Sequence, residues 1–150
     1  MTDTQAFVEI SSRSAAELAE EYLALWNEPD ADRRRRMIAE LWTEDGSQIL
    51  QPPQEMREIA ASSGIGLAAT LEARGRTELE ARATTSFEHW VGSEGLSFRG
   101  RDDADRLGDV VKFHWEAVTN DGETAAVGLN VLVLAADGRI ERNYTFVDGA

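Results

Sequence analysis

The chain of 150 residues is 42% hydrophobic, which is typical of one globular domain that can bury a core. It has no cysteine, which excludes a disulfide framework, a thiol nucleophile and a cysteine-ligated metal. The formal net charge of -13 argues against nucleic acid and anionic membranes as partners, because like charges repel. No apolar run reaches about 18 residues, and the N-terminal residues lack the basic and apolar parts of a signal peptide. We therefore expect a single cytoplasmic domain over residues 1–150, without a membrane or nucleic-acid partner.

Two helices are predicted near the start of the chain. Residues 14–17 have the form of a capping box, and Asp30 is suited to cap the second helix. Apolar residues at helical spacing then mark one buried face on each helix. On the first helix they are Leu18, Tyr22, Leu25 and Trp26, and on the second Met37, Ile38, Leu41 and Trp42.

The middle of the chain has weaker signals. Residues 47–51 are a short strand candidate, which Pro52-Pro53 ends. Residues 54–62 are weakly helical, with Met56 and Ile59 as apolar anchors, and residues 64–73 are expected to be extended. A second capping box at residues 77–80 predicts a third main helix. Its apolar face carries Leu79, Ala83, Phe87, Trp90 and Val91.

The rest of the chain predicts strands. Residues 96–101 and 110–118 are strand candidates, and the second is rich in β-branched and aromatic residues. Asp121-Gly122 and Asp137-Gly138 are hairpin turn signals. Two further strands are therefore expected, one on each side of Asp137-Gly138. Helices followed by an antiparallel meander around one core are typical of the α+β class.

Two asparagines interrupt the apolar runs around Asp137-Gly138. If this dipeptide is a two-residue turn, Leu132 pairs with Asn143 and Asn130 pairs with Thr145. Paired residues share a sheet face, so the two amides lie on the same face, within reach of each other through a water. An amide pair on an apolar face is either satisfied within the protein or belongs to a ligand cavity.

The turn at Asp121-Gly122 decides which residues of the preceding strand join this face. A two-residue turn pairs Phe113 with Asn130 and places Trp115 on the amide face. The same turn directs His114 to the opposite face. A three-residue loop with a bulge would shift the register by one and exchange the two sets.

Several segments together resemble the NTF2-like superfamily, particularly its SnoaL-like, polyketide-cyclase branch. They are residues 22–53 (YLALWNEPDADRRRRMIAELWTEDGSQILQPP), Gly75-Arg76-Thr77, residues 110–118 (VVKFHWEAV), Gly128-Leu129-Asn130 and residues 137–140 (DGRI). The resemblance covers nearly the whole chain. It implies a curved antiparallel sheet wrapped around three helices, a conical apolar pocket, and a homodimer formed across the outer sheet face. Residues 52–74 exceed the usual pattern and are expected to place an extra helix over the pocket mouth.

The resemblance also implies roles for individual residues. In the ketosteroid isomerases of this superfamily, a tyrosine on the first helix and a protonated aspartate donate to the oxyanion, and Tyr22 and Asn130 match them. The catalytic base of those enzymes is an aspartate before a proline, and Gln51 matches it. Asn143 matches the aspartate of the limonene-epoxide-hydrolase type. Donors therefore remain, but amides stand where the general bases are expected.

The candidate residues form two groups. Tyr22, Asn130 and His114 are the candidate catalytic residues, and histidine is included because it can exchange a proton near neutral pH. The candidate ligand-binding residues are Trp26, Trp42, Gln51, Phe87, Trp90, Phe113, Trp115, Leu132 and Asn143. No cofactor and no metal site are predicted.

Three functions are compatible with these residues. The first is a pocket protein that binds a small apolar or polycyclic molecule without turning it over. The second is a cyclase, isomerase or hydratase in which Tyr22 and Asn130 polarise a carbonyl and His114 or a water moves the proton. The third is a protein-interaction adaptor that has no ligand and uses the outer sheet face.

Overall fold

The structure is a computed structural model that describes residues 13–52, 54–65 and 70–149. Within these residues, the helices are α2 (Ala15–Asn27), α3 (Ala31–Leu41), α4 (Gln54–Ser62), α5 (Gly75–Ser86) and a π-helix, η1 (Phe87–Ser93). The strands are β1 (Trp42–Leu50), β2 (Leu71–Arg74), β3 (Ser97–Gly100), β4 (Asp105–Leu107), β5 (Val110–Val118), β6 (Thr124–Leu134) and β7 (Ile140–Gly149). The predicted α+β class is confirmed.

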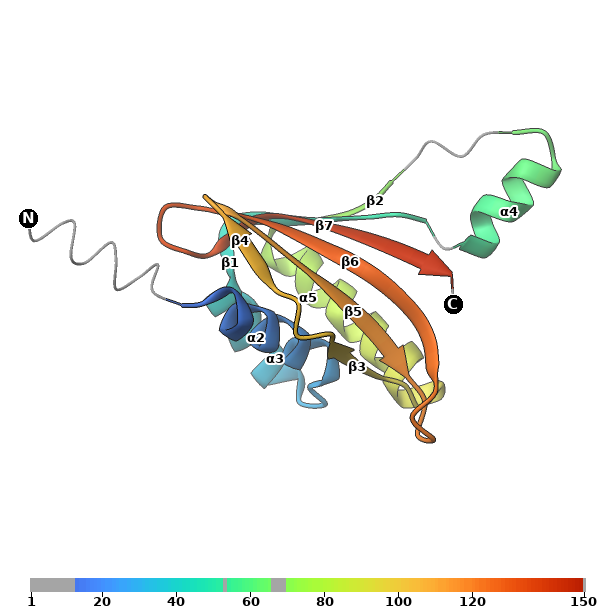
Figure 1. Cartoon of the computed structure of the whole chain (residues 1–150), viewed down its shortest axis with the longest axis horizontal. Helices are drawn as coiled ribbons and strands as arrows, with labels where there is room; N and C mark the ends of the chain where they lie inside the picture. Colours follow the sequence, from blue (N-terminus) through green and yellow to red (C-terminus); the bar gives the residue numbers. More distant parts are fainter. Residues whose placement is uncertain (1–12, 53, 66–69, 150) are drawn as a thin grey trace, which may run out of the picture.

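All of these strands belong to one sheet in the order β2-β1-β7-β6-β5-β3, and β4 also pairs with β5. The pairs are antiparallel except for β1 and β7, which run parallel. The sheet is curved, and α2, α3 and α5 lie together on one side of it (Figure 1). The predicted arrangement of a curved sheet on three main helices is therefore confirmed, with one parallel pair added.

Two of the three predicted helix starts are confirmed. The Ser14 hydroxyl accepts the backbone N–H of Glu17 at 3.0 Å, and the Asp30 carboxylate accepts the N–H of Asp32 at 2.9 Å. The third start is wrong, because α5 begins at Gly75 rather than after Thr77. Gly75 has a φ of 80°, a left-handed conformation that glycine adopts at low cost, and it turns the chain from β2 directly into the helix.

The π-helix η1 changes the face on which the aromatic residues after α5 lie. A π-helix has more residues per turn than an α-helix, so the helical spacing used for prediction does not continue past Ser86. Phe87 is half-buried below the Arg34 guanidinium, whose Cζ lies 5.1 Å from the ring centroid. Trp90 is 41% exposed. The single buried face predicted for residues 79–91 is therefore wrong beyond Ala83 and Ser86.

The strand pairs predicted on the amide face are confirmed, but both turns differ from the expectation. Leu132 pairs with Asn143, Asn130 with Thr145, and Phe113 with Asn130. Each hairpin loop has three residues rather than two, because the N–H of Thr119 donates to Glu123 O and that of Ala135 to Arg139 O. A bulge near each loop then shifts the register back by one residue. The effects of the longer loop and of the bulge on the strand register therefore cancel, and the predicted pairs are kept.

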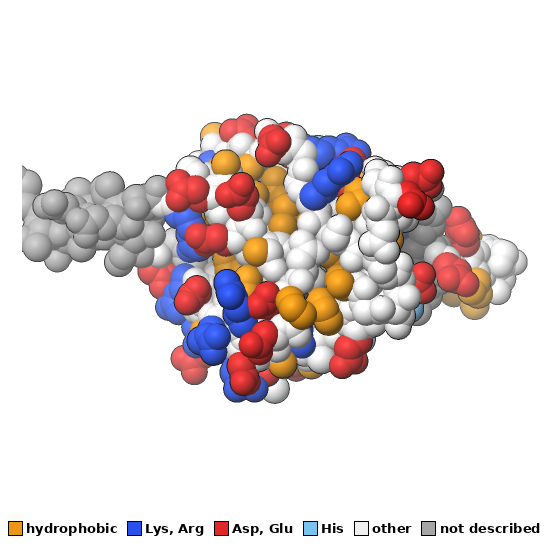
Figure 2. All heavy atoms as spheres, turned by 90° about the horizontal axis from the view of Figure 1, so that it is seen from below, with side chains coloured by type: hydrophobic (Ala, Val, Ile, Leu, Met, Phe, Trp, Pro, Cys, Tyr) orange, Lys and Arg blue, Asp and Glu red, His pale blue; other side chains and the backbone are white. Residues whose placement is uncertain are grey.

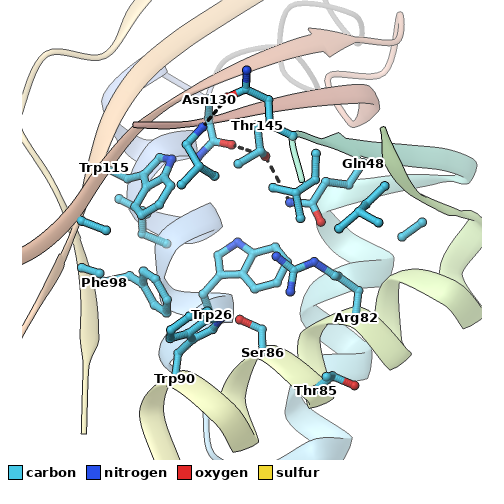
Figure 3. Close-up of a pocket in the computed structure, with 18 of the residues that line it drawn as sticks. Trp26, Gln48, Arg82, Thr85, Ser86, Trp90, Phe98, Trp115, Asn130 and Thr145 are labelled. Atoms are coloured by element: carbon cyan, nitrogen blue, oxygen red, sulfur yellow. Dashed lines mark hydrogen bonds between the residues drawn. The ribbon is translucent and has the colours of Figure 1, made fainter. Parts of the chain in front are cut away.

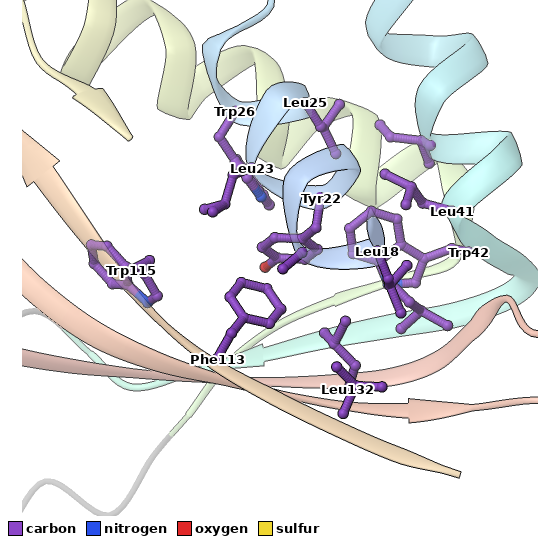
Figure 4. Packing of buried hydrophobic residues seen from close by; sticks show 14 of the residues in the cluster. Leu18, Tyr22, Leu23, Leu25, Trp26, Leu41, Trp42, Phe113, Trp115 and Leu132 are labelled. Carbon is purple, nitrogen blue, oxygen red and sulfur yellow. The ribbon is translucent and has the colours of Figure 1, made fainter. Parts of the chain in front are cut away.

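The apolar core lies between α2, α3 and the sheet. Figure 4 shows Tyr22, Trp42, Phe113 and Leu132 packed together, and each of them is at most 2% exposed. The Tyr22 ring centroid is 5.7 Å from that of Trp42 and 5.4 Å from that of Phe113. Contacts of this kind stabilise the core beyond simple burial. They also fix Tyr22 at the point where the core meets the polar residues of the sheet.

The extra helix expected within residues 52–74 is α4, which stands apart from the other helices beside the end of β7 (Figure 1). Arg57 Nη2 of this helix donates to the Val147 carbonyl at 3.3 Å. Ile59 is 61% exposed, so its prediction as an anchor is wrong, and the side chain of Met56 lies outside the described part of the structure. Of residues 64–73, which were expected to be extended, residues 71–73 lie in β2 as predicted, Gly64 is in a turn, and residues 66–69 lie outside the described part of the structure.

Acidic and basic side chains are interspersed over the face shown in Figure 2, and hydrophobic side chains are exposed there in small areas between them. The outer face of the sheet carries half-buried Val131, Val133 and Tyr144. Within the described residues, no helix is long and apolar enough to cross a membrane. The homodimer across the outer face stays a prediction, which the sedimentation mass of the protein would test.

Candidate functional site

A cavity of about 820 Å³ lies between the sheet and helices α2, α5 and η1 (Figure 3). Its walls carry five aromatic side chains, Tyr22, Trp26, Trp90, Phe98 and Trp115. The volume is within the usual range for small-molecule sites, which are mostly apolar with a few converging polar groups. Here the polar groups come mainly from β1, β6 and β7 on the sheet side and from α5 on the helix side.

The sheet side of the cavity holds a buried hydrogen-bond network. Asn130 Oδ1 accepts from Thr145 Oγ1 at 2.7 Å and from Asn143 Nδ2 at 3.1 Å. The Tyr22 hydroxyl lies 2.6 Å from Asn143 Oδ1 and 3.1 Å from Asn130 Oδ1. Because a hydroxyl has a single proton, it donates to the nearer oxygen, that of Asn143. Gln48 Nε2 donates to Thr145 Oγ1 at 3.1 Å and to the Tyr22 oxygen at 3.3 Å. The five side chains therefore mostly satisfy one another.

The two amides contact each other directly rather than through a water. They lie on one sheet face, as predicted, but only Asn130 lines the cavity, whereas Asn143 is 0% exposed behind it. The amide pair is therefore satisfied within the protein, and its second interpretation, as part of a ligand cavity, stays a prediction. Asn143 is a buried polar residue satisfied within the protein, and Asn130 also borders the cavity.

Burial raises the pKa of Tyr22 to about 12, and hydrogen bonding by Thr145 and the nearby charge of Arg82 only partly oppose this shift. The hydroxyl is therefore protonated at neutral pH. Its proton is donated to Asn143 in this structure, so a ligand would have to replace that hydrogen bond to receive it.

We expect the stability of the protein to fall at high pH because of Tyr22. Tyrosine ionises near pH 10 in an unfolded chain, whereas Tyr22 ionises at about 12 in the native state. The native state therefore holds this proton more tightly. The resulting stabilisation is present below about pH 10 and is lost as the pH rises towards 12, by up to roughly 3 kcal/mol.

Urea unfolding at about pH 9 and pH 12 would measure this loss, with Tyr22→Phe as the variant that should lack this part of the pH dependence. Tyr144→Phe is the control at the other tyrosine of the chain, and it should behave like wild type. An equal loss in wild type and Tyr22→Phe would show that Tyr22 is not the titrating group.

Arg82 is the main cavity residue that the sequence analysis missed. It projects from α5 towards Trp26, with its Cζ 5.4 Å from the indole centroid (Figure 3). Burial lowers its pKa from the usual value. A signal was present in the sequence, because Arg82 lies three residues after Leu79 and four before Ser86, on the buried face of the helix.

Six of the predicted site residues line the cavity: Tyr22, Trp26, Gln51, Trp90, Trp115 and Asn130. The other predicted ligand-binding residues do not line it: Trp42, Phe87, Phe113, Leu132 and Asn143. Three of these are apolar enough for a pocket wall: Trp42, Phe113 and Leu132. The Tyr22 ring packs against Trp42 and Phe113, so these side chains belong to the core. Gln51 is tied to β7, since its Oε1 accepts the N–H of Val147 at 2.9 Å.

The assignment of His114 to the site is wrong in this structure. Its neighbours Phe113 and Trp115 face the interior, so His114 projects from the opposite sheet face. Its Nδ1 lies 2.5 Å from Asp103 Oδ2, and both side chains are substantially exposed. Partial burial opposes ionisation of Asp103, but hydrogen bonds from the His114 backbone and ring outweigh it and lower the pKa of the carboxyl. The described residues include no cluster of His, Asp and Glu suited to hold a metal ion.

A scan against models of protein families finds no match, and neither does a search of curated proteins. Solved structures do match. A proposed isomerase of the SnoaL-like family from Agrobacterium tumefaciens is 25% identical, with a TM-score of 0.70, over 88% of this chain and 95% of that chain. A SnoaL-like protein of unknown function from Burkholderia thailandensis is 18% identical, with a TM-score of 0.58, over 90% of this chain and 94% of that chain. A proposed polyketide cyclase from Sinorhizobium meliloti is 11% identical, with a TM-score of 0.52, over 86% of this chain and 93% of that chain.

The curved sheet, the helices on one side of it and these similarities show that the chain shares the fold of the SnoaL-like and NTF2-like proteins. The predicted cone of α+β type is confirmed by a further match, a protein of unknown function with a cystatin-like fold from Methylobium petroleophilum, which is 20% identical with a TM-score of 0.59. This class supports ligand binding or cyclase- and isomerase-type chemistry, and the fold alone does not decide between them.

Proposed function

We propose that this protein binds a small, largely apolar molecule in the cavity and does not turn it over by the aspartate chemistry of its relatives. The observation that carries this proposal is the sheet side of the cavity. The positions that match the catalytic carboxylates hold Gln51, Asn130 and Asn143, and each of these amides hydrogen-bonds to other groups of the protein. The aromatic walls supply the apolar surface that such a ligand needs.

Intrinsic fluorescence can test this proposal, because three of the four tryptophans, Trp26, Trp90 and Trp115, line the cavity. We expect a saturable change with at least one member of a panel of steroids, polyketide-like aromatics and terpenoids. Ala81 borders the cavity from α5, so Ala81→Phe should fill part of it and weaken binding by roughly tenfold or more.

Ala24→Phe is the matched control, because Ala24 is exposed on α2 and does not line the cavity. This variant should bind like wild type. A flat response to the whole panel, or the same affinity in Ala81→Phe and wild type, would contradict a ligand site in this cavity.

A second candidate is an enzyme of the cyclase, isomerase or hydratase type, and it is favoured by one observation. Tyr22 and Asn130, which match oxyanion donors of related enzymes, border the cavity together. Such an enzyme would exchange the proton at the α-carbon of a bound ketone, and Tyr22→Phe would abolish the exchange. Deuterium incorporation followed by NMR would measure it, and the absence of exchange in wild type would exclude this candidate for that ketone.

A further inference from the structure

Arg82 places a positive charge in the cavity with no negative charge paired to it. Its guanidinium packs against Trp26, and its Nε is buried without a hydrogen-bond partner. Among the described residues, no carboxylate forms an ion pair with it. The side chain is half-buried, so water replaces the missing partner only in part.

The lack of a partner is not caused by a shortage of acids, because the chain has 28 Asp and Glu against 15 Lys and Arg. Four carboxylates border the same cavity, but all four are exposed: Glu55, Glu72, Glu78 and Asp148. Glu72 pairs with Arg74 at 2.9 Å, and Glu78 accepts the backbone N–H of Arg74 at 3.0 Å. These acids are therefore in contact with water or engaged elsewhere, and they leave Arg82 uncompensated.

An unpaired charge that is partly removed from water destabilises a folded protein, and a partner of opposite charge offsets this cost. The guanidinium Cζ lies over the Trp26 ring, 5.4 Å from its centroid. A guanidinium in such a position can still offer N–H donors to a carboxylate in a two-bond geometry. The cavity around this edge is lined by apolar and aromatic residues, where such a pair is screened less than at the surface.

Three other buried polar atoms of cavity-lining residues also lack a hydrogen-bond partner among the described residues: Trp26 Nε1, Trp115 Nε1 and Gln48 Oε1. The two indole N–H groups can only donate, whereas Gln48 Oε1 can only accept, and the Nε2 of the same side chain belongs to the network. Since this oxygen can only accept, it suits a ligand hydroxyl rather than a second anion. The cavity of about 820 Å³ has room for a planar ring system beside the tryptophans.

We propose that the ligand of this cavity is an apolar, ring-containing hydroxy acid whose carboxylate pairs with Arg82. This inference rests on the proposed ligand-binding function and adds the chemical class of the ligand. It also gives Arg82 a role in selecting charged over neutral molecules of the same shape, because a neutral molecule would leave the guanidinium unpaired.

Calorimetric titration with 6-hydroxy-2-naphthoate and with its neutral methyl ester can test this inference, because the two probes share the ring and the hydroxyl. We expect wild type to bind the acid on the order of tenfold to a hundredfold more tightly than the ester. Arg82→Gln should lose this preference, with most of the change in the affinity for the acid. Arg36→Gln makes the same change of charge at an exposed position of α3 outside the cavity, and it should keep the preference.

The stability of the ligand-free variants gives an independent result. Because Arg82 has no anionic partner, Arg82→Gln should leave the Tm unchanged or raise it, and Arg82→Lys should keep part of the preference for the acid. A fall in the Tm of Arg82→Gln by more than about 5 °C would assign Arg82 a structural role and overturn the inference. Equal affinities of wild type for the acid and the ester, or no binding of the acid, would also overturn it.

The two proposals fail in different ways. If neutral molecules of the fluorescence panel bind in a manner that Ala81→Phe weakens, while wild type shows no preference for the acid over its ester, the ligand site stands and only the acid is wrong. If no molecule of either set binds, both proposals are wrong.

Discussion

Replacing Asn143 by leucine is expected to lower the free energy of unfolding by about 2–4 kcal/mol, although the two side chains share the same branching and number of heavy atoms. Asn143 is 0% exposed, accepts the Tyr22 hydroxyl at 2.6 Å and donates to Asn130 at 3.1 Å. Leucine would remove both hydrogen bonds and leave their partners in a buried, mainly apolar environment, where polar groups without partners are costly. Urea unfolding followed by tryptophan fluorescence would measure the difference.

Two further variants show whether the network is the cause. Asn120→Leu makes the same substitution in an exposed loop, and it should change the free energy of unfolding by less than about 0.5 kcal/mol. The double variant Tyr22→Phe with Asn143→Leu should cost less than the sum of the two single variants, because both remove the same hydrogen bond. Strict additivity would contradict the direct bond between these two side chains.

Replacing Gly128 by alanine should lower the free energy of unfolding by a similar amount, and it should also change the shape of the cavity. A Cβ at this position would lie 2.2 Å from the Phe146 carbonyl oxygen and 2.4 Å from Cε2 and Cζ2 of Trp115. Neither neighbour can move freely, since one is backbone and the other is a buried ring, 8% exposed, that forms part of the cavity wall. We expect a loss of roughly 3 kcal/mol together with a displaced Trp115.

The displacement can be followed separately from the stability. The fluorescence of the ligand-free protein should change in Gly128→Ala, and any ligand found for wild type should bind more weakly. Gly92→Ala is the control, because the nearest atom to a Cβ there is the Phe87 carbonyl oxygen at 3.5 Å, an ordinary contact. If Gly128→Ala were as stable as wild type, the close packing of Trp115 on β6 would be wrong.

Local signals in the sequence were enough for much of the fold. Ser14 and Asp30 carry caps that satisfy the first N–H groups of their own helices, so they could be recognised without the rest of the protein. The alternation along β5 placed Phe113 and Trp115 on one face and His114 on the other, because successive side chains of a strand point to opposite sides. The pairing of Asn130 with Thr145 was predicted from a two-residue turn, and it holds because the bulge in the hairpin restores the register that the three-residue loop shifts.

The site depends on contacts that no local pattern contains. The parallel pairing of β1 with β7 places Gln48 beside Asn143, and α2 brings Tyr22 to both amides. The π-helix after α5 decides that Trp90 borders the cavity while Phe87 lies under Arg34. Helical spacing could not show this change of period.

The sequence by itself determined the α+β class, the helix starts at Ser14 and Asp30, and the sheet face of the amides, because each depends on residues close together in the chain or on a strict period. Only the tertiary structure decided that Asn143 is a buried network residue, and that Arg82 lies in the cavity without an anionic partner among the described residues. These outcomes depend on which groups fill the space around a side chain after folding, and burial and electrostatic pairing are properties of that assembled environment.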